Sequence, residues 1–301
     1  MAMVTSYMDE TGHSDDPAFR FAGMAGFVTP ADLWEKLGKT WQEILDVFSL
    51  KEPFHMKDFA HSSGQFREWK GKETKRQLLF RTLVQLIVKI DAIPIGAIVS
   101  LDDFETLSEG QRKAFVDPYY VAFQTCTKGA ALIAAAFPPE KIVMVYSYNK
   151  EFGTIKPQET YSVDQAGRAE KLWHAMKDTT YYGQWMGAYS SGSPAEIVQL
   201  QAADLFAYEL AKEFQNLICR PKDGMRYGLR QILPLVTKPW PMVRLFDRKE
   251  LLRLIIEGNL PYTEGTEEVG DIDRQLIAEH WRRTEWLKQR ADVDMSEDDL
   301  S

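Results

Sequence analysis

The sequence predicts an α/β protein with a mixed central sheet, helices on both faces of that sheet, and a helical C-terminal extension. The first observation behind this prediction is a hairpin pattern. Residues 3–8 and 19–29 both have strand character, and turn residues at 13–17 separate them. The second observation is that helical and strand-like segments alternate after the hairpin. This order favours a mixed sheet covered by helices on both faces.

The hairpin segments and the helix after them are justified by residue spacing. In 19–29, alternate residues share one face, and the glycines indicate close approach of another backbone. A helix should follow, with Thr29 as its cap, Pro30 at its first position and apolar residues at three-to-four spacing through Phe48. That helix should pack on the hairpin.

The remaining elements follow from the same periodicities. We expect helices over 73–90, 119–137, 159–177 and 200–214, and strands over 93–101, 141–146 and 185–190. Residues 54–59 form a short extended piece in this interpretation. The α/β domain would then span 1–217, an irregular and helical extension 218–290 with a final helix at 272–290, and an acidic mobile tail 291–301.

The composition is that of a protein able to bury a large core. The chain has 301 residues, of which 45% are hydrophobic and 27% charged. No apolar stretch reaches the roughly 18 residues of a membrane helix, and the N-terminus lacks a basic and apolar leader. We therefore expect a cytoplasmic protein with no membrane partner. Cys126 and Cys219 have no metal-ligand spacing, so neither a zinc site nor a disulfide framework is expected.

The formal net charge of -8 is unevenly distributed. Residues 264–301 contain twelve acidic and five basic residues, so the body of the chain is almost neutral. Two basic clusters lie in that body: Arg67, Lys70, Lys72, Lys75 and Arg76 form the first, and Arg220, Lys222, Arg226 and Arg230 the second. Each is either a solvated helix end or an anion-facing surface.

The first candidate site is Asp9-Glu10-Thr11-Gly12, two carboxylates at the end of an apolar strand. Consecutive strand residues point to opposite faces, so a regular strand directs only one of the two to a given site, and Asp9 is the stronger candidate. An ordinary acidic turn is the alternative.

The second candidate is Asp204, which lies in an otherwise apolar helix among small residues. Burying an unpartnered carboxylate costs several kcal/mol, so Asp204 needs a partner. A cation, Gln201 or Tyr208 one turn away, or backbone N–H groups at a helix start would each serve.

If Asp9 and Asp204 meet in the fold, a divalent metal site is the simplest account, because two close carboxylates repel unless positive charge neutralises them. Oxygen ligands favour Mg²⁺ or Mn²⁺, and the natural chemistry of such a site is phosphodiester hydrolysis. His55 would supply a proton-transfer group or contact a phosphate there. The alternative for His55 is a semi-buried side chain satisfied by its neighbours.

Three motifs together resemble a known family. They are Tyr7-Met8-Asp9-Glu10-Thr11-Gly12, Phe54-His55-Met56-Lys57-Asp58-Phe59, and Gln201-Ala202-Ala203-Asp204-Leu205-Phe206-Ala207-Tyr208. Their order and separation resemble the bacterial and phage family named domain of unknown function 3800. The resemblance covers roughly residues 4–215 and implies a ribonuclease H-like fold and a metal-dependent nuclease, with Asp9 and Asp204 as the matching acidic positions.

Two departures from the pattern affect the implied site. Thr11 stands where the pattern has Ser, which preserves a hydroxyl group. The segment 141–146 is followed by Ser147-Tyr148-Asn149, whereas a ribonuclease H-like site commonly has another acidic residue at a comparable strand end. Glu10 or Asn149 would then have to complete the metal coordination, and a two-metal mechanism is disfavoured.

The leading hypothesis is therefore a Mg²⁺- or Mn²⁺-dependent nuclease or phosphodiesterase that acts on DNA or RNA. In it Asp9 and Asp204 hold metal, Glu10 completes or adjusts the coordination, and His55 assists at the phosphate. The alternative is a non-catalytic module that binds nucleic acid or a protein through the basic clusters and the tail. A third hypothesis is a phage-defence effector whose acidic tail shields a basic channel. A homo-oligomer is left open.

Overall fold

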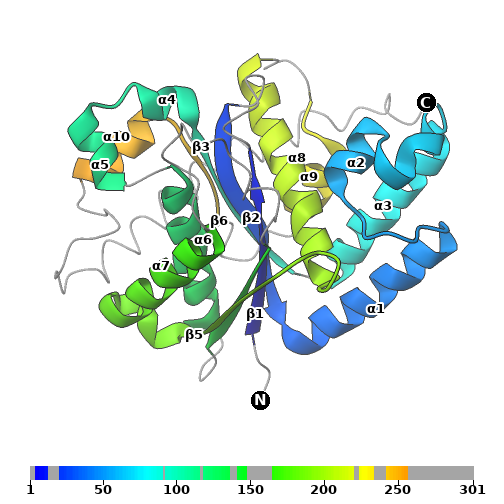
Figure 1. Cartoon of the computed structure of the whole chain (residues 1–301), viewed down its shortest axis with the longest axis horizontal. Coiled ribbons are helices and arrows are strands. Elements are labelled where there is room, and N and C mark those ends of the chain that lie inside the picture. The colour runs from blue at the N-terminus through cyan, green and yellow to red at the C-terminus, as the bar shows by residue number, and fades with distance from the viewer. Residues whose placement is uncertain are drawn as a thin grey trace.

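The computed structural model has three layers, with a sheet between two groups of helices (Figure 1). It describes residues 4–12, 20–90, 92–115, 118–135, 141–147, 165–219, 224–233 and 242–256. The predicted turn at 13–17, the final helix at 272–290 and the acidic tail at 291–301 lie outside these residues. The α/β prediction is confirmed.

The described strands form one mixed six-stranded sheet in the order β5-β4-β1-β2-β3-β6. The strands are β1 (Val4–Thr11), β2 (Phe21–Pro30), β3 (Ile93–Ser100), β4 (Ile142–Ser147), β5 (Met186–Gly192) and β6 (Met242–Phe246). Strands β1, β2 and β3 form an antiparallel meander. Strand β4 is parallel to β1, β5 to β4, and β6 to β3.

The β1–β2 hairpin is confirmed and places the glycines of β2 against neighbouring strands. A Cβ on Gly26 would lie 1.9 Å from the Tyr7 carbonyl oxygen, and one on Gly23 would lie 2.6 Å from that of Ala97. Neither position tolerates a side chain unless the strands move apart. Most of β2 is buried because helices cover both of its faces.

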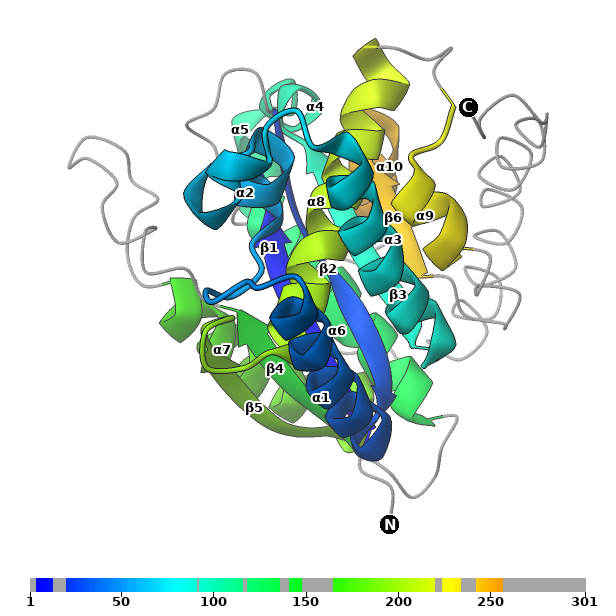
Figure 2. The ribbon, with the colours of Figure 1, turned by 90° about the vertical axis from the view of Figure 1, so that its right-hand side faces the viewer.

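One helical layer covers the sheet face that carries Tyr7 and Phe27 (Figures 1 and 2). It consists of α1 (Ala31–Val47), α2 (Met56–His61), the 3-10 helix η1 (Gly64–Trp69), α3 (Glu73–Lys89), α8 (Gln199–Cys219) and α9 (Tyr227–Ile232). Helix α8 packs along β1 and β2. Its apolar residues and those of α1 and α3 fill the core on this side of the sheet.

The other layer covers the face that carries Val4 and Met8. It consists of α4 (Leu101–Glu105), α5 (Glu109–Phe115), α6 (Pro118–Ala135), α7 (Gln165–Thr179), the 3-10 helix η3 (Tyr181–Trp185) and α10 (Arg248–Ile256). Cys126 is buried in α6, and burial raises the pKa of its thiol. A thiol kept neutral in this way is unsuited to nucleophilic chemistry.

Three expectations about the elements need correction. Thr29 does not cap α1, because it belongs to β2 and Pro30 holds the cap position without a side-chain hydrogen bond. The 54–59 segment is not extended throughout, since α2 begins at Met56. In the proline-interrupted region after 218, β6 is a strand of the main sheet, which the sequence pattern did not indicate.

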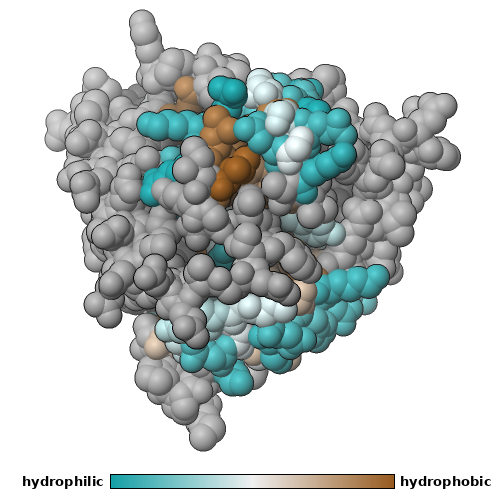
Figure 3. All heavy atoms as spheres, turned by 90° about the vertical axis from the view of Figure 1, so that its left-hand side faces the viewer, coloured by the Kyte–Doolittle hydropathy of each residue, from teal (hydrophilic) through white to brown (hydrophobic). Residues whose placement is uncertain are grey.

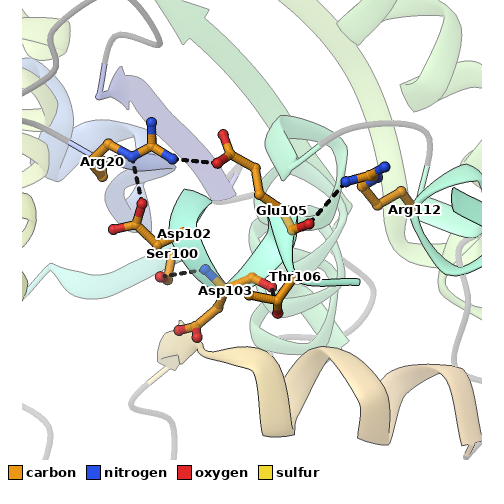
Figure 4. A network of polar contacts seen from close by, with 7 residues as sticks. All are labelled: Arg20, Ser100, Asp102, Asp103, Glu105, Thr106 and Arg112. Carbon is orange, nitrogen blue, oxygen red and sulfur yellow. Dashed lines mark hydrogen bonds and ion pairs between the residues drawn. The ribbon is translucent and has the colours of Figure 1, made fainter. Parts of the chain in front are cut away.

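An exposed polar network holds the start of α4 against the start of β2 (Figure 4). Arg20 Nε donates to Asp102 Oδ1 at 2.6 Å, and its Nη2 donates to Glu105 Oε2. Ser100 caps α4 by accepting the Asp103 N–H at 3.3 Å, which confirms Asp102 and Asp103 as helix-start residues. Both ion pairs are exposed, so they contribute little to the stability of the fold.

The described surface opposite α1 and α3 is mainly hydrophilic, with one small hydrophobic area in its upper part (Figure 3). Helix α10 keeps Leu252, Leu254 and Ile255 partly exposed. Among the described helices, none is both long and apolar enough to cross a lipid bilayer.

Candidate functional site

The first site residue, Asp9, lies near the end of β1, where β1 and β4 finish at the same edge of the sheet. Met8 pairs with Tyr146 in the parallel register, so Asp9 is level with Ser147 at the end of β4. The Ser147 hydroxyl donates to the Asp9 carboxylate, and the Glu10 N–H donates to Asp9 Oδ1 at 2.9 Å. These two bonds fix the carboxylate on the edge where parallel strands end.

The second site residue, Asp204, lies in the second turn of α8 and is 9% exposed. Its Oδ2 accepts a 2.7 Å hydrogen bond from the N–H of Met56, the first residue of α2. The backbone partner predicted as one alternative therefore exists, but it belongs to α2 and not to the helix that carries Asp204. Burial raises the pKa of Tyr208, another suggested partner, and the charge of Asp204 adds to this increase.

The charge of Asp204 acts on the Asp9 carboxyl. Burial, followed by the charge of Asp204, raises the pKa of Asp9 to about 8, although the bonds from Ser147 and Glu10 oppose this. Burial also raises the pKa of Asp204, against the opposing effects of His55 and the Met56 N–H. Two carboxyls in this state favour either a shared proton or a bound cation.

Gln201, one turn before Asp204, has a structural function. Its Oε1 accepts hydrogen bonds from Trp41 Nε1 and from the Phe54 N–H, both at 2.9 Å. Its Nε2 donates to the Pro194 carbonyl at 2.9 Å. Gln201 and Asp204 together therefore hold the backbone of 54–56 against α8, which brings His55 to the site.

His55 lies at the cap position of α2 and is paired with Asp58. Its Nδ1 is 3.3 Å from Asp58 Oδ2, and Ser63 Oγ donates to Asp58 Oδ1 at 2.6 Å. Burial alone would raise the pKa of Asp58, but the bonds from Ser63 and His55 and the charges of His55 and Lys57 outweigh it, and the pKa is lowered. An ionised Asp58 can only accept, so His55 Nδ1 is the donor of this pair and Nε2 is left for another partner.

Glu10 occupies the strand position next to Asp9 and falls on the other face of the sheet. Met8 packs in the core that contains α6, whereas Tyr7 packs in the core that contains α8. By the two-residue strand period, Glu10 follows Met8, and Asp9 follows Tyr7 toward α8. Asn149, the other residue suggested to complete the coordination, lies outside the described residues.

The described residues fit a single hard cation better than a pair. They include no group of three or more His, Cys, Asp or Glu side chains placed to hold an ion. Mg²⁺ is commonly bound through one or two carboxylates while water and substrate phosphates complete its octahedron. Asp9 and Asp204 are the residues that could supply those carboxylates.

The sequence matches no protein-family model, and no curated protein was found to be related to it. The chemistry of the site therefore has to be argued from the residues themselves.

Two residues of the site were not singled out from the sequence. Asp58 could have been found from the His55-x-x-Asp58 spacing, because residues three apart at a helix start are neighbours. The sequence marks Ser147 only as a strand end that lacks an acidic residue, whereas its hydroxyl binds Asp9. The feature that points to Ser147 is its position at the end of a buried strand that runs parallel to β1.

Proposed function

We propose that this protein is a metal-dependent nuclease that hydrolyses phosphodiester bonds in nucleic acid. Asp9 and Asp204 would hold one Mg²⁺ or Mn²⁺ ion. The observation that carries this proposal is the pair of interacting carboxyls from β1 and α8, both with pKa values raised by burial. Such a pair is unfavourable in an empty site and becomes favourable when a divalent cation neutralises it.

The strand arrangement supports a ribonuclease H-like organisation of the sheet, which is the fold that the resemblance to the domain of unknown function 3800 family implies. Strands β1, β2 and β3 form an antiparallel meander. On the side of β1 away from β2, the sheet continues with the parallel strands β4 and β5. In this arrangement Asp9 lies on the central strand, and α8 crosses the same face with Asp204. Both positions agree with that family likeness.

The site residues would have different roles in hydrolysis. A bound ion would supply Lewis-acid stabilisation of the charge that develops on the phosphoryl oxygens. Ser147 and the Glu10 N–H orient Asp9, while the Met56 N–H orients Asp204. His55, held by Asp58, offers Nε2 to accept a proton from the attacking water or return one to the leaving oxygen.

The test is hydrolysis of fluorescently labelled DNA and RNA oligonucleotides in Mg²⁺ or Mn²⁺, with EDTA as the metal-free reference. We expect Asp9→Asn and Asp204→Asn each to reduce the rate by at least about 10³-fold. Both changes keep the side-chain volume, and the amide introduced by Asp204→Asn retains an oxygen for the Met56 N–H. Asp102→Asn, an exposed change in the α4 network, is the matched control and should leave the rate unchanged. Equal activity of the wild type and all three variants would refute the proposal.

A second candidate function is a non-catalytic module that binds nucleic acid on the same fold. One observation favours it: the described acidic residues near Asp9 do not form a group of three possible metal ligands. Binding would then persist in EDTA, and Asp9→Asn would not change it. Metal-stimulated cleavage by the unmodified chain would exclude this candidate.

A further inference from the structure

The described residues of the two basic clusters differ in how far their charges are neutralised; Arg220 and Lys222 of the second cluster lie outside the described residues. In the second cluster, Arg226 donates from Nε and Nη2 to Glu209, which is 1% exposed, and its backbone N–H donates to Glu213. Arg226 therefore anchors the segment before α9 to α8. Its charge is used inside the fold and is unsuited to binding an external anion.

Within the first cluster, Arg76 also has a structural function. Its Nη2 donates to the carbonyls of Phe59 and Ala60 at the end of α2, and its Nη1 pairs with Glu73 at 3.3 Å. Arg76 thus fastens α2 to the first turn of α3, and its charge is balanced by Glu73.

The other four cations of this cluster remain exposed. Arg67, Lys70 and Lys72 make no ion pair with any residue that the structure describes, and Lys75 Nζ lies 3.9 Å from the centroid of the Trp69 ring. Glu68 is the one acidic residue in the segment 67–72. We name Arg67, Lys70, Lys72 and Lys75 the η1–α3 basic patch. It carries excess positive charge on a protein whose formal net charge is -8, so it should attract polyanions that the rest of the chain repels.

The η1–α3 basic patch is connected to the candidate site through α2. Asp204 binds the first N–H of α2, and Arg76 binds its last carbonyls from α3. Helix α2 also packs against η1 and α8, and Figure 2 shows α2 and α3 on the same side of the sheet as α8. A polyanion on the patch therefore lies on the helical unit that carries His55.

The character of the patch indicates the partner. Surfaces that bind single strands expose aromatic rings on which bases stack, but Phe66 and Trp69 in this segment are 1% and 6% exposed. Duplex RNA is recognised by its A-form shape and by 2′-hydroxyl contacts as well as by its phosphates, whereas all four patch side chains are cations suited to phosphates. Cations alone suit the phosphates of duplex DNA, which dominate sequence-independent affinity.

We infer that the η1–α3 basic patch binds the sugar–phosphate backbone of double-stranded DNA and positions it beside the Asp9–Asp204 site. The inference rests on the proposed function for what happens to the DNA at that site. Binding itself can be measured without any hydrolysis.

The experiment measures fluorescence anisotropy of a labelled DNA duplex of about 24 base pairs with the full chain in EDTA, between about 50 and 200 mM salt. The test variant replaces Arg67, Lys70, Lys72 and Lys75 with Gln. The control variant replaces Lys36, Lys39, Lys89 and Lys113, four exposed lysines elsewhere, with Gln. We expect the patch variant to bind at least about tenfold more weakly at about 100 mM salt, with a salt slope lower by about 2 to 4, because each lost phosphate contact removes about 0.9 from that slope.

Several results would overturn the inference. One is unchanged duplex binding by the patch variant, and another is equal weakening by the control variant. Tighter binding of the single strand or of an RNA duplex would contradict duplex DNA as the partner, as would patch-dependent binding of phosphatidylserine vesicles without DNA binding. Patch-dependent binding without Mn²⁺-stimulated cleavage would refute the proposed function and leave this inference standing.

Discussion

Asp204 Oδ2 accepts a 2.7 Å hydrogen bond from the Met56 N–H, so the carboxylate that interacts with Asp9 also fixes the start of α2. One side chain of α8 thereby joins the acidic pair to the segment that carries His55. This double function makes the effects of substitution at position 204 depend on which property is removed.

Asp204→Asn should separate the charge of this residue from its hydrogen bond. The amide keeps an acceptor for Met56, whereas Asp204→Ala leaves that buried N–H unsatisfied. We expect the Ala variant to have a free energy of unfolding about 1–3 kcal/mol below that of the Asn variant. Urea denaturation at pH 8 in EDTA measures the difference. Equal stability of the two variants would show that the bond to Met56 contributes nothing.

The stability of the metal-free protein should decrease as pH rises from about 4 to about 8. The folded pKa of Asp9 is raised to about 8, so the native state holds a proton that the unfolded state loses near the ordinary carboxyl pKa. The stabilisation is complete below the unfolded pKa and is lost as pH rises through the folded one. Asp9 contributes at most about 6 kcal/mol to this loss, at about 1.4 kcal/mol per unit of pKa shift.

Denaturation in EDTA at pH 5, 6, 7 and 8 tests this dependence, with Asp9→Asn as the comparison. The Asn variant should show a flatter profile and be the more stable protein at pH 8. A wild-type profile that rises toward pH 8 would contradict the raised pKa and the interaction between the two carboxyls.

Gln201→Ala should be among the more destabilising single changes in the protein. It removes the acceptor of Trp41 Nε1 and of the Phe54 N–H, and the donor to the Pro194 carbonyl. We expect a loss of about 2–4 kcal/mol, because buried polar groups are left unsatisfied. Gln199→Ala, which loses one 3.3 Å bond to the Trp34 carbonyl, is the control and should cost less than about 1 kcal/mol. A similar small loss for both would refute the structural function of Gln201.

The local periodicity of the sequence was sufficient to predict most of the strands and helices. The strand pattern in 19–29 and the turn residues before it predicted the hairpin, although β2 is buried on both of its faces. The start of α2 was not predictable in this way, since Met56 is held by a side chain 148 residues further along the chain. Strand β6 was obscured by prolines on both sides, and only its parallel pairing with β3 defines it.

The candidate site was predictable only in part. An acid among small apolar residues identified Asp204 as needing a partner, and the strand end identified Asp9. That the two interact depends on how α8 crosses β1, which no local pattern contains. Asp58 and Ser147 were missed because each acts by orienting another side chain, and neither has an unusual sequence context.

The pairing of His55 with Asp58 predicts unequal effects on nuclease activity. His55→Gln removes the basic Nε2 and should lower kcat by about 10²-fold, within the range of general acid–base catalysis. Asp58→Asn leaves the imidazole but weakens its orientation, so we expect a loss of about tenfold in kcat with little change in KM. The exposed pair His174 and Glu170 provides a control, since His174→Gln should have no effect. Equal kcat for His55→Gln and the wild type would exclude His55 from proton transfer.

Divalent metal should stabilise the protein more at high pH than at low pH. Metal ligands must be deprotonated, and the pKa of Asp9 is raised to about 8, so an ion must displace a proton over most of the physiological range. At a fixed Mn²⁺ concentration, the rise in Tm relative to EDTA should therefore grow from pH 6 to pH 8, because ligand binding to the native state adds RT ln(1 + [L]/Kd) to its stability. Asp9→Asn and Asp204→Asn should each abolish most of the rise, whereas Asp102→Asn should retain it. An equal Mn²⁺ effect in all of these variants would place the bound ion away from the two carboxyls, and a rise that does not depend on pH would mean that neither carboxyl releases a proton when the ion binds.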